Sequence, residues 1–188
     1  MEYFKIVESN NERLLLLINE ILDLSRIESE KVQFTLAPTD LTQMCKEIYD
    51  SLALRCPKDV SFVIDEKSPQ DITILTDKNR LTQVLSNLIG NSFKFTKQGT
   101  VTFGFRKGIN NTISFFVKDT GVGMQKEKAS KIFDRFTKLN DFVQGSGLGL
   151  SICKTIVEKL GGTISVETEE GKGSKFLVVL PLKEVTIK

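Results

Sequence analysis

Two asparagines and a lysine share one face of a predicted helix. Asn87, Asn91 and Lys94 stand four and then three residues apart, a spacing that places side chains on the same side of an α-helix. Amide oxygens are neutral ligands that suit Mg²⁺, and a lysine ammonium attracts phosphate. The three residues therefore predict a site for magnesium and a polyphosphate. A solvated polar helix face would have the same spacing and is the alternative.

A glycine-rich stretch, "DTGVG" from Asp119 to Gly123, follows a predicted strand. A dinucleotide-binding GxGxxG pattern would need glycine at position 126, where Lys126 stands. A carboxylate would repel a pyrophosphate, but it can accept a hydrogen bond from an adenine amino group. Gly121 and Gly123 would let the backbone come close to the base. The stretch predicts an adenine site, with a tight turn capped by Asp119 as the alternative.

A second stretch, "GSGLGLSI", places Gly145, Gly147 and Gly149 at the start of a predicted helix. Free backbone N–H groups and the helix dipole attract phosphate at such a position. A flexible linker before a helix is the alternative. The later "GKGS" at Gly171 is not a P-loop, because Val166 occupies the position of its first glycine.

A chain that mixes helices with hairpins must position these residues. Periodicity and turn residues predict its elements. In the first half they are a helix over residues 1–28, a strand at Val32–Leu36, a helix at Leu41–Leu54, strands at Val60–Ile64 and Ile72–Thr76, and a helix from Lys78 capped by Asp77. In the second half they are a hairpin of Thr100–Arg106 and Thr112–Lys118, a short helix at Lys126–Phe133, a polar loop at Thr137–Gly147, a helix at Leu148–Leu160, and a hairpin of Thr163–Glu167 and Ser174–Pro181. Because this order has no regular βαβ repeat, it predicts an α+β fold, a two-layer sandwich of helices on a mixed sheet.

Composition restricts the class of protein further. The 188 residues carry a net charge of +2, with basic residues scattered rather than clustered, which gives no support for nucleic-acid binding. No apolar run approaches the roughly 18 residues of a membrane-spanning helix. Cys45, Cys56 and Cys153 are widely separated and predict a reducing, intracellular setting. The absence of histidine excludes any mechanism that needs a histidine of this chain.

The leading helix is apolar on two sides. Leu14, Leu17, Ile21 and Leu24 form one stripe, and a second stripe consists of Leu15, Ile18 and Leu22. A helix with two apolar stripes is expected to pack on two sides, as in a bundle. The first stripe is the predicted surface for association with a second chain. The alternative is that the helix packs only on its own domain.

Four segments together resemble a known family. In order, "DKNRLTQVLSNLIGNSFKFTKQG", "DTGVGM", "KIFDRFTKL" and "GSGLGLSI" resemble the N, G1, F and G2 boxes of the ATP-binding domain of sensor histidine kinases. "RLLLLINEILDLSRIES" resembles the second helix of that family's dimerisation and phosphoacceptor hairpin, and the loop before the last box resembles that of hybrid kinases. The resemblance covers essentially the whole chain. It implies a GHKL (Bergerat) fold, with residues 1–30 from the hairpin and 31–188 as the catalytic domain.

The same resemblance implies the residues of the site. Asn91 is expected to bind Mg²⁺ with the help of Asn87, and Asp119 to accept the adenine amino group. Lys138 and Arg135 are the candidates for a basic residue that reaches the γ-phosphate. The other implied residues are Lys94 at the phosphates, Phe95 beside the nucleotide, Gly121 and Gly123 beneath the adenine, Phe133 and Phe136 as anchors of the loop, Gly145, Gly147, Leu148 and Gly149 on the phosphate side, and Ser174 near the adenine.

The implied activity is signal transduction by transfer of the γ-phosphate of ATP to a histidine. In this family that histidine lies on a helix before the one that begins here, so the chain is expected to bind ATP without phosphorylating itself. The expected partners are ATP, the phosphoacceptor hairpin, the receiver domain of a response regulator and, in the full-length protein, a second copy. The resemblance implies a cytoplasmic domain of a parent attached to the bacterial inner membrane.

Three other functions are the alternatives to a histidine kinase. ATPases of the same fold use a glutamate to activate water at the position of Asn87, and an amide cannot act as a general base. Serine kinases of the anti-sigma type share the fold, but the leucine-rich leading helix favours a histidine-kinase hairpin. A degenerate nucleotide-binding or interaction module is disfavoured because Asn91, Asp119 and the glycines are all present.

Overall fold

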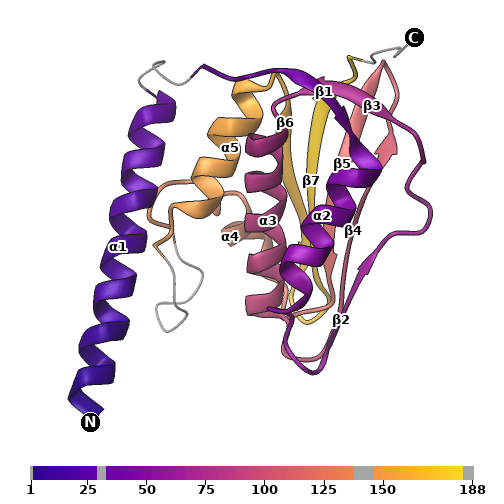
Figure 1. Cartoon of the computed structure of the whole chain (residues 1–188). Helices are drawn as coiled ribbons and strands as arrows, with labels where there is room; N and C mark the ends of the chain where they lie inside the picture. The colour runs from indigo at the N-terminus through magenta and orange to yellow at the C-terminus, as the bar shows by residue number, and fades with distance from the viewer. Residues whose placement is uncertain (1, 29–32, 138–145, 184–188) are drawn as a thin grey trace.

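The computed structural model describes residues 2–28, 33–137 and 146–183. Its elements are α1 (Glu2–Glu28), β1 (Ala37–Asp40), α2 (Leu41–Ala53), β2 (Val60–Ile64), β3 (Thr73–Thr76), α3 (Lys78–Phe95), β4 (Gly99–Lys107), β5 (Thr112–Asp119), α4 (Lys126–Ala129), α5 (Gly149–Lys159), β6 (Thr163–Glu169) and β7 (Gly173–Pro181). Figure 1 shows α2, α3 and α5 on one face of a sheet, with α1 standing beside this unit.

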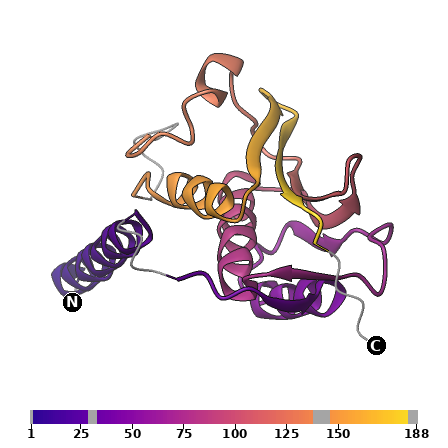
Figure 2. The same cartoon turned by 90° about the horizontal axis from the view of Figure 1, so that it is seen from above.

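The main sheet has five strands in the order β2-β4-β5-β7-β6, and β1 pairs with β3 in a separate two-stranded sheet. The main sheet is mixed because β2 runs parallel to β4, whereas the other neighbours are antiparallel. Seen from above in Figure 2, α2, α3 and α5 form one layer and the sheet the other, with α1 apart from both. The predicted α+β sandwich with a leading helix is therefore confirmed.

Helix α3 carries the asparagine face and begins at a defined cap. Oδ1 of Asp77 accepts a hydrogen bond from the Arg80 N–H at 3.0 Å, which satisfies one of the free donors of the first turn. Oδ2 of Asp77 accepts from the Thr35 N–H at 3.0 Å, so the segment after α1 is tied to the same residue. One apolar stripe of α3 faces the sheet and is buried. It consists of Leu81, Val84, Leu85, Leu88, Ile89 and Phe93.

Strand β5 delivers an acidic residue to the inside of the sandwich. Ile113, Phe115 and Val117 point toward the helix layer and are fully buried. Alternate residues of a strand point to the same face, and Asp119 continues this series at the end of β5. A carboxylate is thereby placed beneath the helices, at a position where apolar side chains precede it.

Two local predictions were wrong. Residues 33–36 of the predicted strand Val32–Leu36 have no regular structure, and the strand lies at Ala37–Asp40 instead. Pro38 is tolerated there because β1 pairs on one side only, with β3. The helix predicted at Lys126–Phe133 is the short α4, followed by turns. A first helical turn gains few hydrogen bonds for the residues that it orders, and most helices in proteins are stabilised by packing. Helix α4 has no buried residue to stabilise further turns.

The buried and exposed leucines of α1 do not coincide with the two predicted stripes. Leu24 and Ile27 are buried against the domain and Leu17 is half-buried. Leu24 is therefore not available for association with a second chain. Five other leucine and isoleucine side chains of α1 are exposed, and we call them the outer face of α1: Leu14, Leu15, Ile18, Ile21 and Leu22. Leu15 and Leu22, at the edge of this face, also line a groove toward α3. Among the described residues, every helix is too short or too polar to cross a membrane.

Candidate functional site

The centre of the candidate site is the carboxylate of Asp119, whose residue is only 3% exposed. Its Oδ1 accepts hydrogen bonds from the backbone N–H groups of Gly121 at 2.9 Å and Ser174 at 3.2 Å. Its Oδ2 accepts from the hydroxyl of Ser92 at 3.2 Å. A carboxylate has about four acceptor positions. Asp119 therefore keeps capacity for one further donor.

The electrostatics of Asp119 are unusual for a structural residue. Burial raises the pKa of its carboxyl, and the hydrogen bonds from Gly121, Ser174 and Ser92 offset this only in part. Within the described part of the chain, no lysine or arginine forms an ion pair with it. A buried acid that is held by donors but has no cationic partner is a feature of functional sites.

Two glycines let the backbone after Asp119 pass between other elements. A Cβ on Gly121 would collide with the carbonyl oxygen of Phe95, at the end of α3. That carbonyl accepts a hydrogen bond from the Val122 N–H at 3.2 Å. Gly123 has a φ of +61°, and a Cβ there would collide with the backbone carbonyl of Glu169. The loop thus lies packed between α3 and the β6–β7 hairpin.

Two residues of this site were not found from the sequence. Ser92 bonds Asp119, and Thr168 Oγ1 accepts from the Met124 N–H at 3.0 Å and lies 2.9 Å from the Ser174 hydroxyl. Ser92 occupies a buried position of α3 among apolar neighbours. A polar residue at such a position is a signal that could have identified it. Thr168 has no comparable signal, because its neighbours come from other elements.

The two asparagines of the site, Asn87 and Asn91, lie on α3, whereas Asp119 lies at the end of β5. The amide nitrogen of Asn87 donates to the Gly149 carbonyl at 3.0 Å, which leaves its Oδ1 as an acceptor. A Cβ on Gly149 would lie 2.8 Å from that amide nitrogen. Asn91 is half-buried, and its side chain makes no hydrogen bond to any described residue. The Lys94 ammonium lies 5.5 Å from the centre of the Phe95 ring. The amide oxygens of Asn87 and Asn91 are neutral ligands that fit a hard cation such as Mg²⁺.

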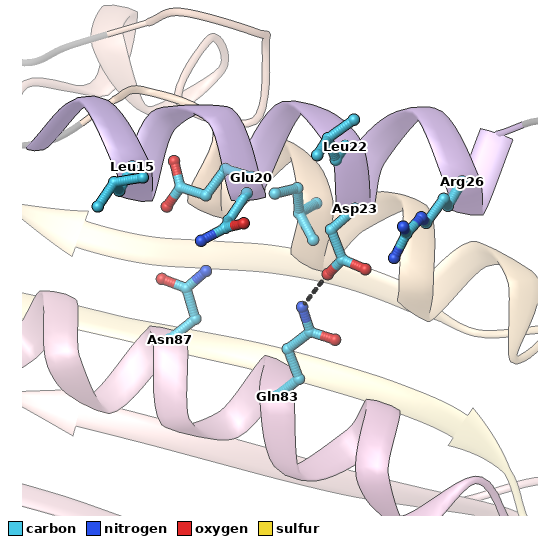
Figure 3. Close-up of a pocket in the computed structure, with 9 residues that line it drawn as sticks. Leu15, Glu20, Leu22, Asp23, Arg26, Gln83 and Asn87 are labelled. Carbon is cyan, nitrogen blue, oxygen red and sulfur yellow. Dashed lines mark hydrogen bonds between the residues drawn. The ribbon is translucent and has the colours of Figure 1, made fainter. Parts of the chain in front are cut away.

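Asn87 also lines an open groove between α1, α3 and α5, with a volume of about 690 Å³. Figure 3 shows Gln83 and Asn87 pointing from α3 toward α1, whose Glu20 and Asp23 face them. Asp119 is not part of its lining. The groove therefore borders the asparagine end of the site and not the buried carboxylate.

The second glycine stretch borders the described residues on one side. Gly147 has a φ of +78°, and a Cβ there would lie 2.8 Å from the carbonyl carbon of Phe136. The residues that flank positions 138–145 therefore lie against each other. Leu148 is fully buried, and its N–H donates to the Ser146 hydroxyl at 3.0 Å. Its side chain is consequently unavailable to a phosphate.

The predicted anchors of this loop differ from each other. Phe133 packs against the core, whereas Phe136 is 64% exposed with a φ of +59°. The anchoring role of Phe136 stays a prediction, because the loop residues 138–145 lie outside the described residues. Lys138 and Gly145 lie outside the described residues, and Arg135 is exposed. Of the two candidates for a basic residue at the γ-phosphate, the structure thus describes only Arg135.

The chain is similar in sequence to known proteins over nearly its whole length. Residues 76–184 match the sequence profile of the family described as "Histidine kinase-, DNA gyrase B-, and HSP90-like ATPase". The chain is 32% identical over 185 residues to the aerobic respiration control sensor protein ArcB of Escherichia coli, covering 95% of this chain and 24% of ArcB. It is 34% identical over 187 residues to the circadian input-output histidine kinase CikA of Synechococcus elongatus, covering 96% and 25%.

A solved structure shares the arrangement of the whole chain. The crystal structure of full-length ShkA in complex with AMPPNP has a TM-score of 0.84 and 29% sequence identity, and the match covers 99% of this chain and 39% of ShkA. The present chain spans about a quarter of the length of ArcB and of CikA.

Proposed function

The chain belongs to the family of histidine kinase-, DNA gyrase B- and HSP90-like ATPases, and we propose that it binds ATP and transfers the γ-phosphate to a histidine of a separate hairpin domain. The observation that carries this proposal is the buried carboxylate of Asp119, which has no cationic partner among the described residues and has one acceptor position left. An exocyclic adenine amino group is a neutral donor that suits this position.

The phosphates and their metal are assigned to the other end of the site. Asn91, with Asn87 beside it, would hold Mg²⁺ through amide oxygens, and Lys94 would meet the phosphates. Bound magnesium would supply charge neutralisation for the phosphoryl group. Gly147 and Gly149 lie before and at the first turn of α5, where backbone N–H groups favour anions.

Transfer is favoured over hydrolysis because of residue 87. Asn87 stands where ATPases of this fold carry a glutamate base, and its amide nitrogen is bonded to the Gly149 carbonyl. Phosphoryl transfer depends mainly on positioning and charge stabilisation, so an acceptor imidazole from another domain does not require a base at this position. The named histidine kinases among the relatives support the same choice.

A mixing experiment tests this function. The chain is combined with radiolabelled ATP and a separate hairpin domain that carries a phosphoacceptor histidine. We expect acid-labile phosphohistidine on the hairpin and no label on the chain itself, which contains no histidine. Steady release of inorganic phosphate that does not depend on the hairpin would instead identify an ATPase.

We also propose that the outer face of α1 packs against the acceptor hairpin, within a homodimeric parent kinase that serves the receiver domain of a response regulator. The support is the exposure of a continuous apolar surface on one helix. In the same mixing experiment, Ile18→Glu should lower transfer to the hairpin while the affinity for ATP stays unchanged. Equal transfer with Ile18→Glu and the parent would exclude this face. Attachment of the parent to a membrane stays a prediction.

The magnesium ligand has its own test in Asn91→Ala. The parent should bind ATP more tightly with Mg²⁺ than without it, with a Kd between about 1 μM and 1 mM. Asn91→Ala should lose about tenfold in affinity with Mg²⁺, about 1.4 kcal/mol, and little without it, because the lost amide oxygen acts through the metal. Calorimetric titration with and without magnesium measures this difference.

Asn79→Ala is the matched control, since Asn79 is an exposed asparagine in the first turn of the same helix. It should bind like the parent under both conditions. If Asn91→Ala instead lowered the thermal unfolding temperature without changing the magnesium dependence, Asn91 would be a structural residue.

A further inference from the structure

Three side chains form a closed polar ring between α1 and α3. Nη1 of Arg80 donates to Asp23 Oδ1 at 3.2 Å and to Gln83 Oε1 at 2.8 Å. Nε2 of Gln83 donates to Asp23 Oδ2 at 2.7 Å, the bond drawn as a dashed line in Figure 3. Each member therefore bonds both of the others. We call this ring of Asp23, Arg80 and Gln83 the polar clamp.

The hydrogen bonds of the polar clamp are directional, whereas the apolar contacts of α1 beside it are not. Leu24 and Ile27 bury apolar surface of α1 next to Asp23, but apolar contacts alone allow a helix to slide or rotate. Hydrogen bonds to an ionised carboxylate fix both distance and angle. The Arg80 and Asp23 side chains are only 21% and 31% exposed, so water competes less for these bonds than at an open surface.

The polar clamp lies on the same face of α3 as the proposed metal ligand. Arg80, Gln83 and Asn87 are spaced three and four residues apart, as members of one helix face are. Asp23 of α1 lines the same groove as Gln83 and Asn87 of α3. Gln83 bonds Asp23, and Asn87 lies one turn further along α3. The tilt of α1 over α3 therefore determines how far α1 stands from Asn87.

We propose that Arg80 and Gln83 are positioning residues, which act through Asp23 to set the angle of α1 over the proposed nucleotide site. The consequence for transfer rests on the proposed function, because the acceptor hairpin would meet the chain on α1. The geometric part does not rest on it. Without the polar clamp, α1 would take a range of angles and the γ-phosphate would be correctly placed for only part of the time.

A neighbouring carboxylate shows that the contact is local. Glu20 lies one turn before Asp23 on α1 and faces the same groove, yet its buried Oε2 has no hydrogen-bond partner among the described residues. Among the described residues, Oε2 of Glu20 thus contributes no hydrogen bond to α3. One turn near the end of α1 carries the polar attachment.

The test measures the angle of α1 directly. Nitroxide labels are placed at Asn11→Cys, on the exposed side of α1, and at Leu54→Cys, which follows α2 and is 95% exposed. The background carries Cys56→Ser, and the other two cysteines are buried. Position 11 lies about 18 Å along the helix from Asp23 at about 1.5 Å per residue, so a small change in tilt moves the label by several ångströms. Pulsed electron paramagnetic resonance reports the distance distribution.

In the parent, we expect one narrow distribution of the distance between the two labels. In Asp23→Ala and in Gln83→Ala, we expect this distribution to become broad. Glu47→Ala is the matched control, since Glu47 lies on α2 and pairs at 2.7 Å with Lys78 in the first turn of α3. This ion pair joins α3 to α2 and not to α1. Glu47→Ala should keep the narrow distribution. Circular dichroism establishes that each variant is folded, and Gln83→Ala removes no charge and serves if Asp23→Ala fails to fold.

The functional part is read separately. In the mixing experiment, Gln83→Ala should lower the rate of transfer about tenfold while the Kd for ATP stays within twofold of the parent, because the polar clamp does not touch the nucleotide. Unchanged distance distributions in both clamp variants would overturn the proposal. Absence of ATP binding in the parent would refute the proposed function and leave the distance result standing.

Discussion

Replacing Asp119 by asparagine should reduce the affinity for ATP about 100-fold, or about 2.7 kcal/mol. The carboxylate offers its remaining acceptor position to the adenine amino group, and a hydrogen bond to a charged group contributes about 1.5–3 kcal/mol. In the variant, an amide NH₂ would face that amino group as donor against donor. Titration calorimetry with ATP gives the two dissociation constants. Asp134→Asn removes an exposed acid and should leave the affinity unchanged.

The fold of Asp119→Asn should survive, which separates the loss of binding from unfolding. The amide oxygen can still accept from Gly121 and Ser174. Burial raises the pKa of the Asp119 carboxyl in the folded chain above its unfolded value, so its stabilising contribution is full at low pH and is lost as the pH rises through the folded pKa. The variant should therefore exceed the parent in stability at neutral pH, and this advantage should shrink as the pH falls.

Denaturant unfolding at several pH values measures the difference. A variant that is less stable than the parent at neutral pH would show that Asp119 is a structural acid. An unchanged affinity for ATP in a folded variant would remove Asp119 from the nucleotide site.

Replacing Gly123 by alanine should lower the free energy of unfolding by about 2–5 kcal/mol. Gly123 has a φ of +61°, a conformation that costs a residue with a Cβ roughly 1–2 kcal/mol. The new methyl group would also collide with the Glu169 carbonyl, and forcing an atom into a packed site costs about 1–3 kcal/mol. Because Glu169 pairs with Gly173 at the end of the β6–β7 hairpin, relief of the collision would displace the hairpin. Urea unfolding followed by circular dichroism measures the loss.

Gly171→Ala separates the two causes of that loss. Gly171 has a φ of +79°, but a Cβ there would meet no atom within 4 Å. Its replacement should cost only the conformational strain, about 1–2 kcal/mol. Equal losses in Gly123→Ala and Gly171→Ala would show that the collision with Glu169 is relieved without cost. Gly123→Ala should also weaken ATP binding, whereas Gly171→Ala should not.

Much of the fold could be predicted because its signals are local. The Asp77 cap and the apolar spacing of α3 each lie within a few residues of the chain, and the turns of both hairpins are marked by glycine or asparagine. The strand at Ala37–Asp40 could not be predicted in this way. Whether Pro38 is allowed in a strand depends on which side of that strand is paired, and that is decided by a partner far along the chain.

The site was predictable to the extent that one motif carries it. Asp119 and its two glycines stand together in the sequence. Ser92 reaches Asp119, and Thr168 reaches Ser174, only after α3, β5, β6 and β7 have come together. The prediction that the stripe containing Leu24 associates with a second chain was wrong for Leu24 for a related reason. Two stripes of equal hydrophobicity on one helix do not reveal which side the domain covers, and the structure buries Leu24.

The double attachment of Asp77 determines how a torque on α1 would enter the domain. One carboxylate oxygen holds Thr35, in the segment that follows α1, and the other holds the first turn of α3. The bonds of Asp23 to α3 provide a second point of attachment within the next turn. Both points lie at the start of the helix that carries Asn87 and Asn91. A twist of α1 would therefore reach the first turns of that helix directly, through these side-chain hydrogen bonds.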